Sequence, residues 1–231
     1  MKPPIVQSAR GITLAGGGPF ARRDLALCLS RAPVTVAADS GADRLLQFGV
    51  MPEAVIGDFD SISQSARLEI PKSRQHVVAE QATTDFDKAL RSLEAPFVLA
   101  LGFAGARLDH GLAAMTTLVA HAGRRCLLVG PRDLAFAAPP RLELAVLPGE
   151  PLSLYPLARV TGRSSGLEWP IDGLVFAPDG QIGTSNRVTE RRVVLEFDAP
   201  GMLVILPRRR LDAAIRALVS APRPPVPLAA R

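Results

Sequence analysis

The chain has 231 residues, and 48% of them are hydrophobic, which is enough to bury the core of one large domain or two small ones. Its formal charge is +5, but only three of its 27 basic residues are lysines. We interpret this as an arginine-rich composition and not as a nucleic-acid-binding surface, because aromatic residues make up only 5% of the chain and no nucleic-acid-binding motif occurs.

The cysteines and the hydropathy pattern argue against two further classes of protein. Cys28 and Cys126 lie far apart in apolar segments, without the close spacing of zinc ligands, so we expect two buried thiols. No apolar run approaches the roughly 18 residues that a membrane helix needs, and the N-terminus lacks the pattern of a signal peptide. The sequence therefore predicts a cytoplasmic protein with no membrane partner.

Short apolar runs that end in Gly or Asp alternate with helical patterns over the first part of the chain. The expected strands are residues 11–18, 34–40, 54–58, 97–103 and 125–130, and the expected helices lie within residues 20–31, 42–49, 85–94 and 108–122. This alternation predicts an α/β domain with a parallel sheet and helices on both faces. Polar side chains should then gather at the carboxyl ends of the strands.

The pattern changes after Pro139 and Pro140. Strand-like runs separated by turns follow, with one helical stretch over residues 211–219, which predicts a small antiparallel all-β domain, a sandwich or a barrel. We expect an α/β domain over residues 1–140, a β domain over 141–220 and a disordered, Pro-rich tail over 221–231. The run of arginines at 208–210 is expected to be a solvated surface.

Asp58 and Asp60 directly follow the apolar run at 54–57. A buried carboxylate costs several kcal/mol unless a cation or hydrogen-bond donors satisfy it. If the chain turns after the strand, the two carboxylates can converge on one hard cation, and Mg²⁺ typically takes one or two carboxylates together with phosphate oxygens. A solvated pair beside a helix cap fits the same two residues equally well.

Further acidic residues occupy equivalent places in successive strand–helix units. Asp39, Asp85 and Asp109 each stand between a predicted strand and a predicted helix, or at the start of the helix. Because these turns share one edge of a parallel sheet, we expect four acids, including Asp58, to converge there around a metal. His110 is the only histidine that is a candidate for a place near this chemistry, whereas Lys88 is expected to form a solvated pair with Asp85.

Five segments, taken in order, resemble the thiamine pyrophosphokinase (thiamine diphosphokinase) family. They are ADSGADRL, VIGDFDSIS, QATTDFDKAL, GARLDHGLA and IGTSN, and together they run from about Ala37 to Asn186. The resemblance implies an α/β domain followed by a β domain, and a homodimer. It also implies an enzyme that uses ATP and Mg²⁺ to convert thiamine to thiamine diphosphate, releasing AMP.

The resemblance also implies roles for individual residues. The acids around Mg²⁺ and the polyphosphate would be Asp39, Asp58, Asp60 and Asp85. Residues lining the catalytic site would be Gln81, Thr84, Arg107 and Asp109, with Asp85 or Asp109 accepting the proton of the attacking hydroxyl. The thiamine pocket would contain Trp169 against the aminopyrimidine ring, with Thr184, Ser185 and Asn186 beside it. Ser40 and Asp43 depart from the Gly and Asn that the family usually has at these positions.

In the family, thiamine lies in a cleft between two subunits, so the resemblance also predicts a shared site. Asp60 of one chain and Trp169 of the other would then build each of the two sites of a homodimer.

Three alternatives remain at this point. AVIGDFDSI also resembles the first motif of haloacid-dehalogenase-type phosphohydrolases, with Asp58 as nucleophile and Asp60 as acid/base. Ile62 in place of Thr or Val, the position after a later strand and the lack of a second paired-aspartate motif argue against it. The second alternative is a non-catalytic thiamine-binding module. The third is a pyrophosphokinase that acts on another hydroxyalkyl heterocycle, such as a pterin; Trp169 together with IGTSN favours thiamine.

Overall fold

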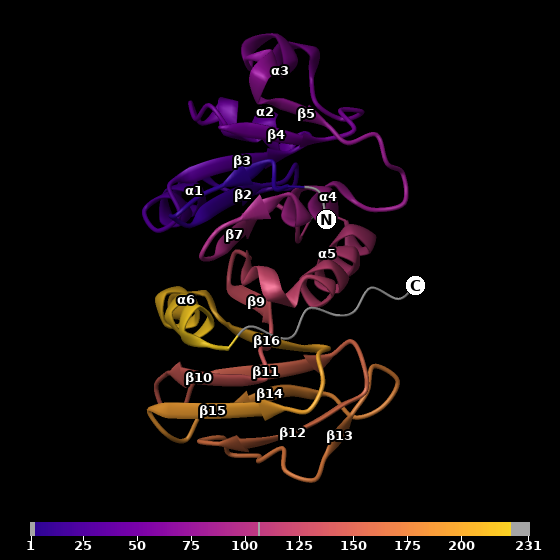
Figure 1. Ribbon diagram of the computed structural model, residues 1–231. Coiled ribbons are helices and arrows are strands. Elements are labelled where there is room, and N and C mark those ends of the chain that lie inside the picture. Colours follow the sequence, from indigo (N-terminus) through magenta and orange to yellow (C-terminus); the bar gives the residue numbers. More distant parts are fainter. Residues whose placement is uncertain (1–2, 106, 223–231) are drawn as a thin grey trace. The chain divides into compact units, whose positions relative to one another are not determined.

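The computed structural model describes residues 3–105 and 107–222 (Figure 1). Contacts between residues divide the chain into two compact units, Met1–Thr117 with Leu128–Pro131 and Leu118–Leu127 with Arg132–Arg231. The predicted tail lies, from residue 223 onward, outside the described residues.

The first unit contains a parallel sheet of short, apolar strands. Its strands are β2 (Ile12–Ala15), β3 (Val34–Ala38), β4 (Ala54–Gly57), β5 (Gln75–Val77) and β7 (Val98–Leu101), in the spatial order β7-β2-β3-β4-β5. Every residue of β2, β3, β4 and β7 is buried, which is the pattern of a sheet covered on both faces. The predicted α/β domain with a parallel sheet is therefore confirmed.

The order of the strands reverses direction between β2 and β7. From β2 the chain moves outward through β3 and β4 to β5, and then returns to β7 on the other side of β2. Because such crossovers are right-handed, α1 (Arg22–Leu29) and α4 (Asp85–Arg91) cover opposite faces of the sheet, as Figure 1 shows. A reversal of this kind is the place where α/β sheets bind ligands, just beyond the carboxyl ends of the strands.

The remaining elements of the first unit are shorter or lie at its margins. They are α2 (Gly41–Gln47), α3 (Gln64–Glu69), a 3-10 turn η1 (Lys72–Arg74), α5 (Leu108–Ala120), β8 (Cys126–Val129), and the parallel pair β1 (Val6–Gln7) and β6 (Leu93–Glu94). A second 3-10 turn, η2 (Ala122–Arg124), belongs to the second unit. Both α5 and β8 cross the division between the units. Both cysteines are buried, as predicted.

Side-chain caps determine where two helices of this unit begin. Thr84 is the N-cap of α4, and its hydroxyl accepts a hydrogen bond from the N–H of Asp87 at 3.3 Å. Ser63 caps α3 in the same way through the N–H of Ala66 at 3.1 Å. The cap at Thr84 places Asp85 on the first turn of α4, at the edge of the sheet where the strands end.

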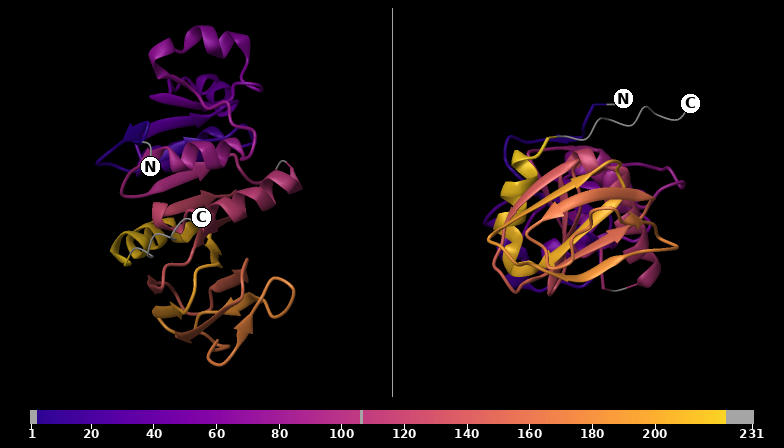
Figure 2. Two further views of the ribbon diagram at one scale, coloured as in Figure 1. Left: turned by 45° about the vertical axis from the view of Figure 1, so that its right-hand side comes forward. Right: turned by 90° about the horizontal axis from the view of Figure 1, so that it is seen from below.

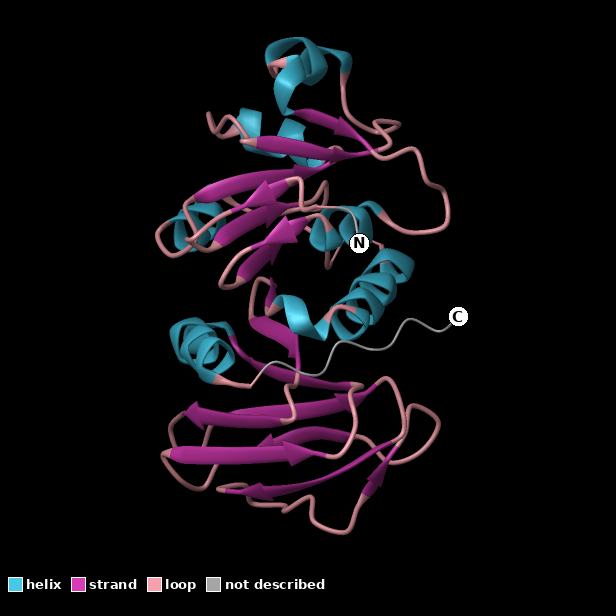
Figure 3. Cartoon of the chain, in the orientation of Figure 1, coloured by secondary structure: helices cyan, strands magenta, loops and turns pink. Residues whose placement is uncertain are grey.

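The second unit is built almost entirely from antiparallel strands (Figures 2 and 3). One sheet has the order β14-β11-β16-β9, from β9 (Asp133–Ala137), β11 (Pro151–Pro156), β14 (Gly183–Arg187) and β16 (Met202–Pro207). The other has the order β10-β15-β12-β13, from β10 (Arg141–Ala145), β12 (Val160–Ser165), β13 (Val175–Phe176) and β15 (Arg192–Phe197). Buried and less buried residues alternate along β10, β11 and β15, whereas β9 and β16 are buried almost throughout. The predicted antiparallel β domain is confirmed.

A turn and one helix complete this unit. The helix expected near the end of the chain is α6 (Leu211–Ser220), which follows η3 (Arg208–Arg210) and packs against β10. The arginines of η3 are not simply a solvated surface, because Arg209 and Arg210 both form ion pairs with the buried Glu150. Among the described residues, no helix combines the length and the apolar character needed to cross a membrane.

Candidate active site

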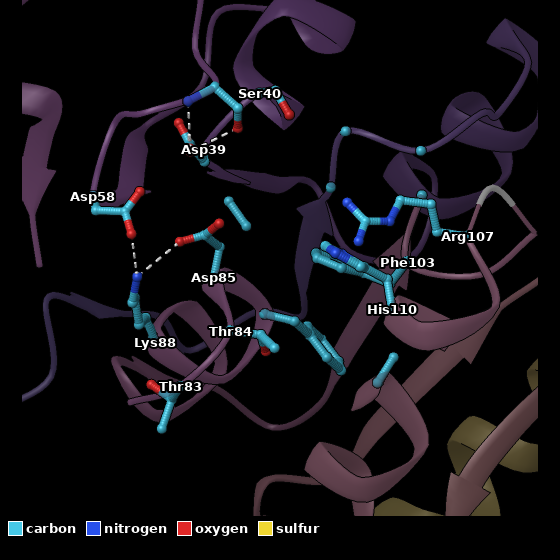
Figure 4. Close-up of a pocket in the computed structure, with 18 residues that line it drawn as sticks. Asp39, Ser40, Asp58, Thr83, Thr84, Asp85, Lys88, Phe103, Arg107 and His110 are labelled. Carbon is cyan, nitrogen blue, oxygen red and sulfur yellow. Dashed lines mark hydrogen bonds and ion pairs between the residues drawn. The ribbon is translucent and has the colours of Figure 1, made fainter. Parts of the chain in front are cut away.

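The first unit has a pocket of about 340 Å³ at the carboxyl ends of its strands (Figure 4). Its walls come from the segments that follow β2, β3, β4 and β7 and from the beginnings of α4 and α5. The lining includes Gly16, Gly17, Gly18, Asp39, Ser40, Asp58, Ser61, Thr84, Asp85, Lys88, Phe103, Arg107 and His110. The pocket therefore lies where the strand order reverses, the place that the topology assigns to a ligand.

The glycine run after β2 packs closely against the end of β7. The N–H groups of Gly16 and Gly18 donate to the carbonyls of Leu101 and Gly102, at 2.8 and 2.9 Å. A Cβ atom on Gly18 would lie 2.5 Å from the carbonyl oxygen of Gly102, so only glycine fits at this position. These two N–H groups are thus bound within the protein, and the run mainly permits a close approach of two backbone segments.

Asp39 is buried at the end of β3 and is fully hydrogen-bonded. Its side chain accepts hydrogen bonds from the N–H and hydroxyl of Ser61, at 3.2 and 2.8 Å, and from the N–H of Ile62 at 3.1 Å. Burial raises the pKa of Asp39, and the hydrogen bonds from Ser61 oppose that rise. Asp39 has a positive φ of 44°, an uncommon conformation for a residue other than glycine. Its carboxylate anchors the loop that carries Asp58 and Asp60.

The chain turns sharply between Asp58 and Asp60. Phe59 has a φ of 67°, in the left-handed region, and the N–H of Asp60 lies 3.4 Å from Oδ1 of Asp58. As a result, one carboxylate oxygen each of Asp39, Asp58 and Asp60 lies within 4.8 Å of the other two. A set of carboxylate oxygens at this separation, one of them exposed to solvent, fits a hard divalent cation such as Mg²⁺.

The side chain of Lys88 lines the pocket and lies between two of the acids. Its side chain is 2% exposed, and Nζ donates to Oδ2 of Asp58 at 2.7 Å and to Oδ1 of Asp85 at 3.2 Å (Figure 4). Burial by itself lowers the pKa of Lys88, but the two carboxylates outweigh this effect and raise it. The hydrogen bond from Lys88 lowers the pKa of Asp58. The expectation of a solvated Lys88–Asp85 pair was therefore wrong.

Asp109 does not join the other acids. It forms an exposed ion pair with Arg107, with 2.6 Å between Nη2 and Oδ2, and this contact lowers the pKa of Asp109 to about 2. Arg107 and His110 line the pocket, whereas Asp109 is not among the lining residues. The predicted convergence of four acids thus brings together Asp39 and Asp58, joins Asp85 to them through Lys88, and leaves Asp109 paired with an arginine.

Gln81 lies at the margin of this site. Its Nε2 is 3.5 Å from Oδ2 of Asp58, a long contact, and its side chain is exposed. Thr84 lines the pocket itself, although its hydroxyl also caps α4.

Ser40 and Asp43, the two residues that depart from the usual pattern of the family that the sequence resembles, each make defined contacts in the structure. Ser40 lines the pocket, and its hydroxyl lies 2.2 Å from where a Cβ atom on Gly17 would be, so it fills the space beside the glycine run. Asp43 accepts hydrogen bonds from the N–H of Ser63, at 3.1 Å, and from its hydroxyl. Asp43 therefore holds the N-cap of α3 and not a group in the pocket.

A second pocket, of about 350 Å³, lies in the second unit between β14 and the segment that joins β12 to β13. The four residues expected to bind thiamine, Trp169, Thr184, Ser185 and Asn186, all line it. Trp169 is 52% exposed, which suits a stacking surface better than a core position. Four apolar side chains that were not predicted complete the wall, because scattered apolar residues in a β domain look like core; they are Ile171, Leu174, Phe176 and Ile182.

Comparisons with known proteins point to one family for both units. A family model described as "Thiamin pyrophosphokinase, catalytic domain" matches residues 25–128. A second, described as "Thiamin pyrophosphokinase, vitamin B1 binding domain", matches residues 142–202. Together the two ranges cover well over half of the chain. The second pocket falls entirely within the second range.

Individual relatives agree with this assignment. Thiamine pyrophosphokinase 3 of Oryza sativa subsp. japonica is 26% identical over an alignment of 211 residues, and the match covers 75% of this chain and 78% of the relative. The thiamine pyrophosphokinase of Bacillus subtilis (strain 168) is 33% identical over an alignment of 105 residues, and the match covers 43% of this chain and 49% of the relative. The solved structure of thiamin pyrophosphokinase from Candida albicans matches with a TM-score of 0.71 at 15% identity, over 85% of this chain and 90% of that chain. This last likeness shows the fold.

Proposed function

The chain belongs to the thiamine pyrophosphokinase family, and we infer that it transfers the diphosphoryl group of ATP to the hydroxyethyl oxygen of thiamine, giving thiamine diphosphate and AMP. The observation that carries this inference is the match of both units to the two domains of one enzyme family. The pocket at the strand reversal adds the chemistry, because it combines carboxylates with a buried lysine and an arginine.

We propose that Asp39, Asp58 and Asp60 hold Mg²⁺. Asp39 already accepts three hydrogen bonds within the protein and Oδ2 of Asp58 accepts one from Lys88, so the exposed carboxylate of Asp60 and Oδ1 of Asp58 are the groups best placed for direct coordination. Asp85, the fourth predicted ligand, lies on the far side of Lys88 from Asp58. Bound Mg²⁺ would supply neutralisation of the polyphosphate charge.

The protein's own side chains would supply positioning and the acceptor for the proton. Phosphoryl-type transfer depends mainly on alignment and on charge stabilisation, so a strong base is not required. Arg107, which lines the pocket and pairs with Asp109, would bind phosphate oxygens, and Gln81 would orient the substrate beside Asp58. Asp85 suits the role of proton acceptor better than Asp109, because its pairing with Arg107 makes Asp109 a very weak base.

Thiamine would bind through the second pocket. The exposed indole of Trp169 would stack on the aminopyrimidine ring, beside the hydroxyls of Thr184 and Ser185. Since the acidic cluster and Trp169 belong to different units, we propose a homodimer in which Asp60 of one chain and Trp169 of the other build each site.

An acceptor assay tests the substrate assignment. The purified protein is incubated with ATP and Mg²⁺ together with either thiamine or a hydroxymethyl pterin, and the diphosphorylated products are separated. We expect thiamine to be converted and the pterin to remain unchanged, because the wall of the second pocket offers the exposed indole of Trp169 and the hydroxyls of Thr184 and Ser185 for the pyrimidine. Preferential conversion of the pterin would overturn the assignment.

A further inference from the structure

The side chain of Asn186 is bonded to the main chain of Trp169. Asn186 is 6% exposed, and its Oδ1 accepts hydrogen bonds from the N–H of Trp169 at 3.2 Å and from the N–H of Arg187 at 2.8 Å. Its Nδ2 donates to the carbonyl of Trp169 at 2.7 Å. The amide therefore binds both main-chain polar groups of Trp169.

A bulge in β14 turns Asn186 inward. Leu152 of β11 pairs with Asn186, whereas Leu154 pairs with Gly183. Between these two pairs β14 therefore contains one residue more than β11, which is a β-bulge. Ser185 accommodates the extra residue with a φ of 62°, and its N–H donates to the hydroxyl of Ser153 at 2.9 Å. The bulge leaves Ser185 exposed and Asn186 buried.

Arg187, the residue after Asn186, also binds the segment that carries Trp169. The carboxylate of Glu168 pairs with Arg187 at 3.0 Å, and the N–H of Glu168 donates to the carbonyl of Arg187 at 2.8 Å. The guanidinium of Arg187 lies 5.9 Å from the centre of the Trp169 ring. Residues 168 and 169 are thus bound to residues 186 and 187, and one side of the indole faces a cation.

We propose that Asn186 is a positioning residue, which fixes Trp169 for stacking on thiamine and does not itself bind the substrate. Its oxygen accepts two N–H groups, which occupies both lone pairs, so it has no acceptor left for a ligand. An exposed aromatic ring binds a ligand better when its main chain is fixed, because any conformational freedom of the ring in the free protein must be lost on binding and lowers the affinity. This inference rests on the proposed function and deepens it.

Because the chain contains a single tryptophan, its fluorescence reports on Trp169 alone. In thiamine-free protein, we expect Asn186→Ala to lower the anisotropy of this emission and to increase its quenching by iodide. Asn186→Asp keeps both acceptor bonds but replaces the Nδ2 donor with an oxygen that faces the carbonyl of Trp169, so its anisotropy should lie between those of the wild type and the alanine variant. It serves where the alanine variant folds poorly. Unchanged anisotropy and quenching in Asn186→Ala would overturn the proposal.

The matched control is Asp198→Ala. Asp198 also binds a main-chain group of the second unit, since it accepts from the N–H and hydroxyl of Thr161 at 2.8 and 2.7 Å. Its loss should leave the anisotropy of Trp169 and the KM for thiamine unchanged.

In Asn186→Ala, the KM for thiamine should rise about tenfold, the scale of a lost aromatic contact, while the KM for ATP stays constant.

A double-mutant cycle separates positioning from direct contact. In a Trp169→Ala background, Asn186→Ala should have almost no further effect on the KM for thiamine, because the residue acts through the indole. An undiminished tenfold effect in that background would show a direct contact and contradict the proposal. Failure of the proposed function would look different: the wild-type protein would neither convert thiamine nor show quenching of Trp169 by it, whereas the anisotropy of the free protein would still test the role of Asn186.

Discussion

Lys88 acts as a cation built into the acidic pocket. Its ammonium lies between Asp58 and Asp85, whose side chains are 12% and 33% exposed, so it balances carboxylates that would otherwise repel each other. The spacing of three residues along α4 explains the contact with Asp85. The contact with Asp58, from 30 residues away, buries the lysine, and no local pattern contains that information.

Replacing Lys88 should therefore destabilise the protein. In Lys88→Met the two acids lose their common partner, and we expect the free energy of unfolding in urea to fall by about 3 kcal/mol. Adding Asp58→Asn should restore part of that loss. The matched control is Lys72→Met at an exposed lysine of η1. A loss no larger than that of the control would show that the buried ion pairs do not matter for stability.

The roles of Asp58 and Asp60 can be tested by removing one charge at a time. Asp58→Asn and Asp60→Asn should each lose roughly 10²-fold in turnover, the scale of a lost electrostatic contribution to the transition state. Binding of thiamine, followed by the fluorescence of Trp169, should persist. Asp87→Asn, on the same helix as Lys88 but paired with Arg91, is the control and should remain active. Isolation of a phosphorylated Asp58 would instead support a phosphohydrolase.

Some site residues followed from the sequence because each acid stands at the end of an apolar strand. Asp39, Asp58 and Asp60 are close together for this reason. The left-handed turn at Phe59 could not be predicted, because nothing in the sequence indicates a positive φ there. Asp109 shows the limit of such reasoning. It occupies the same kind of turn, yet its carboxylate forms an ion pair with Arg107 and does not join the other acids.

At the scale of elements, Glu150 links the turn before β11 to η3. Its side chain is 9% exposed and accepts from Nε of Arg209 at 2.8 Å, from Nε and Nη2 of Arg210 at 2.5 and 2.7 Å, and from the N–H of Leu147 at 3.2 Å. The hydrogen bonds from Arg210, helped by those from Arg209, lower the pKa of Glu150 to about 2 against the opposing effect of burial. The same contacts hold Arg210, the N-cap of α6, beside the turn before β11.

This lowered pKa predicts how stability depends on pH. Since the folded pKa lies below the ordinary value of 4.5, the contribution of Glu150 is complete above about pH 4.5 and is lost as the pH falls toward 2. At pH 7, Glu150→Gln should unfold more easily by about 2 kcal/mol, and the gap from the wild type should close on acidification. Urea unfolding measured between pH 7 and pH 2.5 checks this, and two parallel curves would contradict it.

Long apolar strands were predictable, whereas short polar elements were not. The strands β2, β3, β4 and β7 are buried runs of four or five residues, and the sequence marks each with a Gly or Asp at its end. The elements α3 and β5 were missed because each has few buried residues and depends on neighbours for its conformation. Ser63 at the start of α3 is held by Asp43, which comes from another helix.

At the scale of the whole molecule, mixing two inactive variants tests the proposed shared site. Asp60→Asn and Trp169→Ala should each be poorly active alone. After co-refolding in equal amounts, about half of the dimers are mixed, and each mixed dimer has one site with both defects and one intact site, giving roughly a quarter of wild-type activity by symmetry. Activity no higher than the average of the two variants would reject the shared site.

The most direct test of the account is the stoichiometry of the products. Purified protein is incubated with thiamine, Mg²⁺ and ATP labelled at the β-phosphorus, and both the nucleotide and the thiamine products are separated and quantified. Transfer of the diphosphoryl group predicts AMP and labelled thiamine diphosphate in a one-to-one ratio, with no free phosphate released. ADP with thiamine monophosphate, or inorganic phosphate without any thiamine product, would contradict it.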